Sequence, residues 1–299
     1  MSSLWRDFRG NSCYNAAAMP YDFLLQRIVA LLTEVPGVAA IAIGGSRARG
    51  TATETSDYDI GLYYSTERPL DAKRLLHAVR IFADEPETAQ VTPIGGWGPW
   101  IVGGGWLSVA GRKVDLLYRN IDDVANVIAK CRNGEIDIHY QPGHPHGFCT
   151  AIWMGEVALG RPLHDPDGRL AKLKAATSPY PSALREALIR KFDWEILFAI
   201  ENAELAVARA EQTHVAGCVY RALACVGQVL FALNERYLIN EKGALQEAAK
   251  LPLTIADVEK RANEVWRLLG SNELRAALAA LRAIEREVKP LSGNVADRK

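Results

Sequence analysis

The chain has 299 residues, of which 49% are hydrophobic and 23% are charged, enough for two compact domains or one large α/β unit. This composition excludes a disordered chain, a collagen-like repeat and a small disulfide-rich scaffold. Lys+Arg and Asp+Glu each number 35, so the formal net charge is zero. The charge balance disfavours an extended DNA or RNA substrate, but it still allows a local basic pocket for a small phosphate ligand.

The N-terminal residues and the cysteines indicate a soluble cytoplasmic protein. Arg6, Asp7 and Arg9 lie where a signal peptide would need an apolar stretch, and no apolar run approaches the roughly 20 residues of a membrane span. The five cysteines are scattered and contain no CxxC pair, so we expect free thiols. The sequence therefore predicts a reduced, cytoplasmic protein with no membrane partner, and it does not fix the oligomeric state.

Residues 1–150 are expected to form a mixed α/β domain, because helical spacing and strand alternation follow one another along this half. In chain order the predicted elements are a helix over 21–35, strands over 38–43 and 57–64, a helix over 70–83, Gly/Trp-rich strands around 91–109, a strand over 113–118, a helix over 121–132 and a strand over 135–140.

Residues 151–299 are expected to form a second, α-helical bundle domain. After Pro179-Tyr180-Pro181 no strand pattern appears, and apolar residues recur at intervals of three or four. The longest predicted helices cover 183–209, 254–269 and 272–288, the last ended by Pro290. A loop-rich stretch within 141–180 marks the region of the boundary, which we place at residue 150.

The segment from Gly44 to Asp59 carries the chemistry. A short apolar strand ends in Gly44-Gly45-Ser46, whose backbone can approach a ligand closely and offer N–H groups and a hydroxyl to an anion. Ten residues separate Ser46 from Asp57, and Asp57 and Asp59 share one face of the next strand. Two converging carboxylates repel each other unless a cation such as Mg²⁺ neutralises them. A phosphate-binding turn beside a carboxylate pair indicates a site for a metal–nucleotide complex.

The motif GGSRARG…SDYDIG resembles the GS-x10-DxD signature of the DNA polymerase β superfamily of nucleotidyltransferases. Within that superfamily the chain is most similar to two-domain, small-molecule enzymes of the aminoglycoside adenylyltransferase type. The resemblance implies a third carboxylate on a neighbouring strand, and Asp115 within Lys113–Tyr118 fits this position.

The resemblance also implies the reaction. An acceptor hydroxyl attacks the α-phosphorus of ATP or another NTP, and pyrophosphate leaves. Asp57 and Asp59 would hold Mg²⁺, while Asp115 would either complete the metal site or take the acceptor's proton. Residues 233–248 resemble the segment of aminoglycoside adenylyltransferases in which a lysine approaches the triphosphate, which implies this role for Lys242. The predicted nucleotide-binding residues are therefore Gly44, Gly45, Ser46, Arg49, Ser56 and Lys242.

Two other features remain ambiguous in the sequence. Trp97, Trp100 and Trp106 would either stack a base or ring or pack between strands. His144-Pro145-His146 resembles a metal-binding tract but has no third ligand at a suitable spacing, which favours a turn.

The acceptor is predicted to be a small hydroxylated molecule, with an antibiotic of the aminoglycoside or lincosamide type implied by resemblance alone. One alternative is a protein adenylyltransferase of the minimal-nucleotidyltransferase type, although such proteins usually lack a long helical half. Another is a nucleotide-binding regulatory module without transfer activity, which the intact aspartates disfavour.

Overall fold

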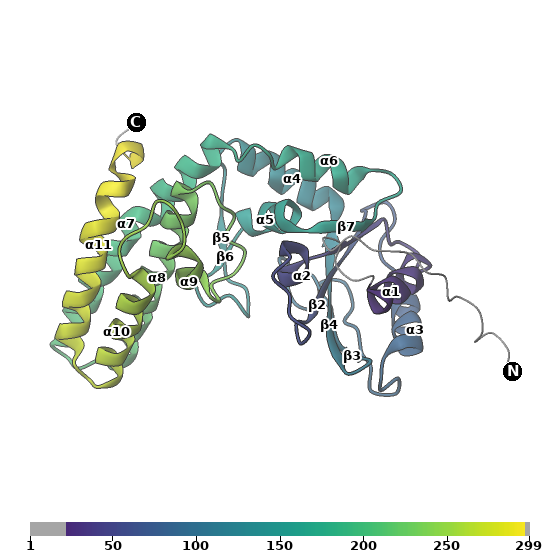
Figure 1. Ribbon diagram of the computed structural model, residues 1–299, viewed down its shortest axis with the longest axis horizontal. Coiled ribbons are helices and arrows are strands. Elements are labelled where there is room, and N and C mark those ends of the chain that lie inside the picture. Colours follow the sequence, from purple (N-terminus) through teal and green to yellow (C-terminus); the bar gives the residue numbers. More distant parts are fainter. Residues whose placement is uncertain (1–21, 297–299) are drawn as a thin grey trace, which may run out of the picture.

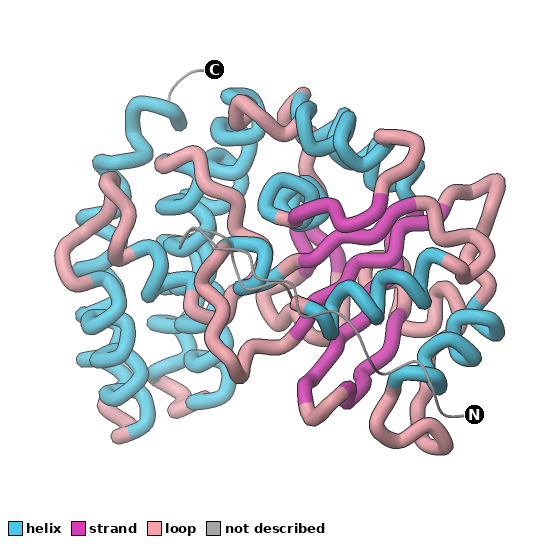
Figure 2. Tube along the Cα trace, turned by 45° about the vertical axis from the view of Figure 1, so that its right-hand side comes forward, coloured by secondary structure: helices cyan, strands magenta, loops and turns pink. Residues whose placement is uncertain are grey.

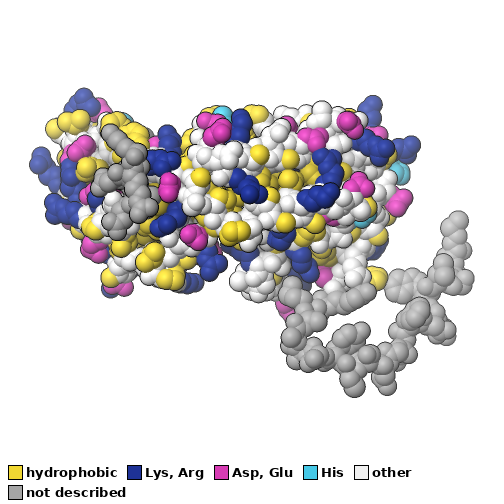
Figure 3. All heavy atoms as spheres, turned by 90° about the horizontal axis from the view of Figure 1, so that it is seen from above, with side chains coloured by type: hydrophobic (Ala, Val, Ile, Leu, Met, Phe, Trp, Pro, Cys, Tyr) yellow, Lys and Arg dark blue, Asp and Glu magenta, His cyan; other side chains and the backbone are white. Residues whose placement is uncertain are grey.

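The computed structural model describes residues 22–296. The predictions for Cys13, for the N-terminal segment and for the first residue of the 21–35 helix lie outside this range. The described chain forms an α/β unit and a helical unit side by side, as the sequence predicts (Figure 1). Figure 3 shows that Lys and Arg side chains lie among Asp and Glu side chains on one face of the molecule.

A five-stranded sheet forms the centre of the α/β unit, with the strand order β3-β4-β2-β1-β7. Its strands are β1 (Ala40–Ile43), β2 (Tyr58–Tyr64), β3 (Gly104–Val109), β4 (Arg112–Asn120) and β7 (Arg161–His164). The central pair β2 and β4 is parallel, whereas the other neighbours are antiparallel. The mixed α/β sheet inferred from the sequence is thus present.

Successive side chains of β4 point to opposite faces of the sheet. Val114, Leu116 and Tyr118 are buried on one face, where α1 (Phe23–Thr33) and α3 (Ala72–Phe82) lie against each other (Figure 2). Asp115, Leu117 and Arg119 point to the opposite face, which faces the cavity described below. Short polar side chains start the helices: Asp22 caps α1, Asp71 caps α3 and Asn120 caps α4 (Ile121–Arg132).

The sheet shows that the α/β unit continues beyond residue 150. β7 pairs with β1 at the edge of the sheet, and α5 (Ala151–Leu159) and α6 (Arg169–Ala176) pack on α4. The predicted boundary therefore places β7 in the wrong unit. We propose instead a division at Pro179–Pro181, directly before α7 (Ser182–Val207).

Two stretches predicted as strands are mostly turns. Within the Gly/Trp-rich stretch only β3 is a strand, because Gly95, Gly98 and Gly103 adopt positive φ angles that break the ladder. Of residues 135–140 only β5 (Ile138–His139) is extended, and it pairs with β6 (Phe148–Cys149) in a separate two-stranded ribbon.

The long helices of the helical unit pack against one another, and the second half of α8 (Gln212–Leu233) is buried on all sides. α7 packs on α8 and α11 (Leu274–Ala296), while α10 (Val258–Gly270) packs on α11 and on the short α9 (Ala244–Ala248). By length and composition alone, α8 is long and apolar enough to cross a membrane. The bundle buries 67% of its most apolar 18-residue window, and this packing accounts for its composition.

The last helix passes through the residue expected to end it. Pro290 lies inside α11, although proline removes an interior hydrogen bond. Residues on both sides are fixed to α7, because Lys289 Nζ lies 2.5 Å from one carboxylate oxygen of buried Asp193 and Ser292 Oγ donates to the other at 2.5 Å. These contacts explain why the helix continues.

Of the cysteines in the described range, Cys218 is only half-buried; all four have free thiols.

Candidate active site

A cavity of about 550 Å³ lies between the α/β unit and the helical unit. Eight of the nine residues predicted from the sequence line it, and they come from α2 (Gly45–Arg49) and the residue before it, from β2 and the residue before it, from β4 and from the loop before α9. These residues are Gly44, Gly45, Ser46, Arg49, Asp57, Asp59, Asp115 and Lys242. The structure therefore brings together in one cavity segments that lie almost 200 residues apart in the chain.

The turn after β1 is shaped by the carboxylate next to it. The Gly44 amide donates a 2.7 Å hydrogen bond to the carbonyl oxygen of Asp59, which joins the turn to β2. Gly45 has a φ of +58°, and a Cβ atom there would lie 1.9 Å from Asp59 Oδ2. Gly45 is thus required both by its backbone conformation and by the close approach of the Asp59 carboxylate.

Arg47 fixes the loop that leads to the aspartates. Its guanidinium donates to the carbonyl oxygens of Ser56 at 2.7 Å and Asp57 at 3.1 Å, and it lies 3.6 Å from the centroid of the Tyr58 ring. The side chain is largely buried and also lies 3.5 Å from Asp22. Arg47 therefore positions Asp57 through the backbone and does not face the cavity.

Ser56 is the one predicted nucleotide-binding residue that does not line the cavity. Its hydroxyl accepts a 2.9 Å hydrogen bond from the Thr53 amide and closes the turn over residues 53–56. The sequence pattern placed Ser56 next to Asp57, but the turn directs its side chain back along the loop.

Asp59 and Asp115 face the cavity side by side. Their Cα atoms are paired in the parallel register of β2 and β4, so both side chains leave the same face of the sheet. Burial raises the pKa of each carboxyl above its usual range, and a neighbouring aspartate raises each pKa further: Asp57 for Asp59, and Asp59 for Asp115. Lys113 and Lys242 act in the opposite direction on the pKa of Asp115.

This donor set fits a hard divalent cation that arrives with a nucleotide. Within residues 22–296 no group of three or more His, Cys, Asp or Glu side chains forms a ready-made metal centre. Mg²⁺ typically binds through one or two carboxylates together with substrate phosphates, so a complete protein cage is not required. After burial, repulsion from a neighbouring aspartate raises the pKa of Asp59 and of Asp115, and a bound cation relieves repulsion of this kind.

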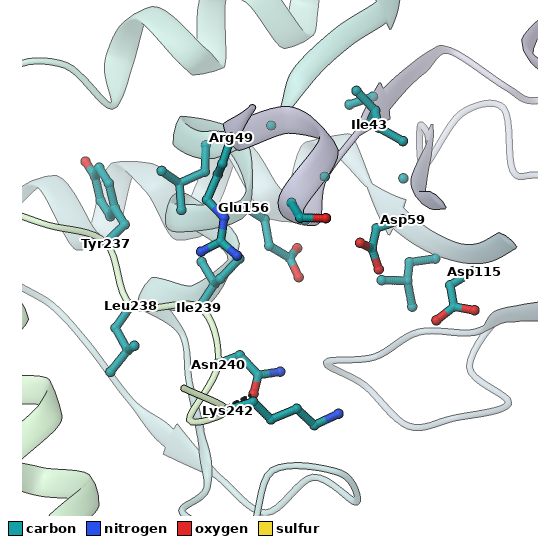
Figure 4. A pocket seen from close by; sticks show the side chains of 18 of the residues that line it. Ile43, Arg49, Asp59, Asp115, Glu156, Tyr237, Leu238, Ile239, Asn240 and Lys242 are labelled. Carbon is teal, nitrogen blue, oxygen red and sulfur yellow. Dashed lines mark hydrogen bonds between the residues drawn. The ribbon is translucent and has the colours of Figure 1, made fainter. Parts of the chain in front are cut away.

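Positive side chains reach the cavity from both units. Arg49 extends from α2 (Gly45–Arg49), and Lys242 extends from the loop before α9 (Figure 4). Arg49 Nη1 lies 3.6 Å from Glu247 Oε2 of α9, so an ion pair links the two walls of the cavity. Both partners are partly exposed, which leaves the Arg49 guanidinium available to an incoming anion.

Glu156, His144 and Glu247 also line the cavity, and none of them was assigned to the site from the sequence. Glu156 of α5 lines the cavity and forms a two-point ion pair with buried Arg119 of β4, with N–O distances of 2.8 and 2.7 Å. The pair fixes α5 to the sheet beside Asp59. His144 also lines the cavity and lies 3.5 Å from the Glu241 carboxylate, as part of a turn rather than a metal tract.

Comparisons with known proteins agree with this geometry. Residues 26–130 match the nucleotidyltransferase domain family, so these residues form a nucleotidyltransferase domain of the polymerase β-like superfamily, which makes the protein a transferase. Residues 153–242 match a domain of unknown function, DUF4037, whose matched range contains Glu156 and ends at Lys242.

A solved structure of a nucleotidyltransferase-like protein from Exiguobacterium sibiricum is 10% identical, covers 89% of this chain and 74% of its own, and gives a TM-score of 0.41. Among curated proteins, no sequence matches this chain.

Proposed function

We propose that the protein is a Mg²⁺-dependent nucleotidyltransferase that moves a nucleoside monophosphate, AMP from ATP, to a hydroxyl of a small molecule and releases pyrophosphate. The observation that carries the proposal is the register of the sheet. It pairs Asp59 with Asp115 on the cavity face, directly beside the Gly44–Ser46 turn.

Each part of the site has a task in this reaction. Amide groups of the turn and the Ser46 hydroxyl bind the β- and γ-phosphates, and α2, with only five residues, adds little dipole to them. Arg49 and Lys242 approach the triphosphate from opposite walls. Asp57 and Asp59 would hold Mg²⁺, which supplies charge neutralisation at the phosphates when bound.

Asp115 serves the acceptor. It lies one strand farther from the turn than Asp59. With the β- and γ-phosphates at the turn, Asp115 would be on the side of the α-phosphorus opposite the leaving group. The acceptor oxygen forms the new bond to the α-phosphorus, the bond to the bridging oxygen breaks, and the hydroxyl proton passes to Asp115. Small-molecule hydroxyls have pKa values far above 7, so this transfer needs a base.

The proposal is tested by incubation with each α-labelled NTP, Mg²⁺ and a panel of hydroxylated acceptors, antibiotics included. We expect pyrophosphate release together with a nucleotidyl mass increase on a small acceptor, and loss of both in Asp59→Asn. Label found only on protein would instead support a protein adenylyltransferase. NTP binding without transfer to any acceptor or protein would support a regulatory module.

The two roles considered for Asp115 are separated by a Mg²⁺ titration of turnover in Asp115→Asn. A proton acceptor predicts a roughly 10²–10⁴-fold loss that raised Mg²⁺ does not restore. Partial recovery of the rate at high Mg²⁺ would show that Asp115 is a metal ligand.

A further inference from the structure

An exposed tryptophan continues the row of aspartates across the sheet. The register pairs Asp59 of β2 with Asp115 of β4, and Asp115 in turn with Trp106 of β3. Directly opposed residues of neighbouring strands point to the same face, so all three side chains share the cavity face. The row runs from the Gly44 turn, past both carboxylates, to Trp106 at the end remote from the turn.

Trp106 offers an open aromatic surface. It is 72% exposed, and its ring stacks on the ring of Trp97 with centroids 4.5 Å apart and an interplanar angle of 21°. Trp97 thus covers one face of the Trp106 indole, and the high exposure of Trp106 indicates that residues 22–296 leave the opposite face open. Large exposed aromatic side chains beside a cavity are typical of binding surfaces rather than of cores.

The loop that contains Trp97 and Trp100 is held in place by hydrogen bonds from two side chains. The amide of Gln141, which is 2% exposed, donates to the Trp97 carbonyl at 2.7 Å, and the indole N–H of Trp153 donates to the Trp100 carbonyl at 3.1 Å. A Cβ at Gly104 would lie 2.8 Å from the Trp97 ring, so the ring occupies space that only glycine leaves free. The tryptophan pair is therefore a pre-formed surface.

We propose that Trp106, supported by Trp97, is the acceptor subsite and takes a hydroxylated six-membered ring. This inference rests on the proposed function, because it assigns the molecule that the Asp115 side of the site receives. Neighbouring strands lie about 4.8 Å apart, a distance comparable to the span of such a ring. A ring stacked on Trp106 therefore brings a hydroxyl on its edge to Asp115, whereas a nucleotide held at the turn lies at the other end of the row.

Both saturated and aromatic rings have a face that packs on indole, and a binding experiment distinguishes them. Fluorine NMR of the 5-fluorotryptophan protein, with Mg²⁺ and a non-hydrolysable ATP analogue, follows titration with myo-inositol, phenol and the linear polyol sorbitol. We expect one ring compound to shift the Trp106 signal, assigned through Trp106→Phe, while sorbitol leaves it in place. The signal of Trp194, 52% exposed on α7, serves as an internal control. No shift with either ring, or an equal shift with sorbitol, would overturn the proposal.

A matched set of variants separates acceptor binding from nucleotide binding. Trp106→Ala should weaken binding of the ring compound about 5- to 10-fold, Trp106→Phe should retain most of it, and Trp194→Ala should be neutral. Calorimetric affinity for the Mg²⁺–ATP analogue should stay within about twofold of wild type in all three. A loss of nucleotide affinity in Trp106→Ala would show that the indole stacks the base, and the proposal would be wrong. Neither the NMR titration nor the calorimetry depends on turnover, so a failure of this proposal can be distinguished from a failure of the transfer assay.

Discussion

The substitution Gly45→Ala tests whether the turn exists to admit the Asp59 carboxylate. The new Cβ would lie 1.9 Å from Asp59 Oδ2 and 2.9 Å from its Cγ, so the carboxylate must rotate away from its position beside Asp115. The φ of +58° adds about 1–2 kcal/mol of backbone strain for any residue with a Cβ. We therefore expect a modest loss of stability but a loss of turnover of at least about 10²-fold, since a metal-binding carboxylate is displaced.

Gly50→Ala is the matched control for this substitution. Gly50 ends the same short helix with a φ of +73°, and a Cβ there would meet nothing within 4 Å. Chemical denaturation should give both variants a similar decrease in unfolding free energy. Only Gly45→Ala should lose Mg²⁺–ATP affinity and pyrophosphate release. Equal activity in the two variants would refute the argument that Asp59 needs the space at Gly45.

Three further predictions concern single side-chain contacts. Glu247→Gln removes the ion pair that holds Arg49 and should raise ATP affinity up to about 5-fold at low salt. Calorimetry should find a smaller increase at high salt, and unchanged affinity at low salt would contradict the prediction. Arg47→Met removes two hydrogen bonds to loop carbonyls and should lower the unfolding free energy by about 1.5–3 kcal/mol in urea denaturation, whereas a loss below 0.5 kcal/mol would contradict it. Burial, and then the charge of Arg221, lowers the pKa of His146 to about 4, which is below the value in the unfolded chain. The contribution of neutral His146 to stability is therefore present above about pH 6.5 and is lost as the pH falls toward 4. That loss should reach about 3 kcal/mol, and His146→Gln should flatten the stability profile over this range; parallel profiles would contradict the prediction.

The sequence predicted those parts of the site that are local in the chain. The Gly44–Ser46 turn and the Asp57–Asp59 pair are encoded by one short stretch, whereas Asp115 was implied by the resemblance and placed by its strand context. Glu156 and Glu247 were missed because they reach the cavity only through packing of α5 and α9, which leaves no pattern in the sequence. Lys242 was predicted by resemblance, and the structure places it in the same cavity.

The fold differs from expectation where tertiary contacts outweigh local signals. β7 has the sequence RPLH, without apolar alternation, and its Pro162 is tolerated because the strand lies at the edge of the sheet. Its pairing with β1 could be seen only in three dimensions, and for this reason the predicted boundary fell too early. Pro290 gave a stop signal that the Asp193 contacts override.

The most direct test of the central claim is calorimetric binding of ATP to wild type and Asp59→Asn, with and without Mg²⁺. Metal-free ATP is repelled by the carboxylates, so removal of one negative charge should leave its affinity equal or higher. With Mg²⁺ the wild type should bind ATP more tightly than Asp59→Asn does, because the carboxylate holds the cation. This reversal of order on addition of Mg²⁺ is the predicted result. The same order under both conditions, or equal affinities throughout, would contradict the assignment of Asp59 to a metal–nucleotide site.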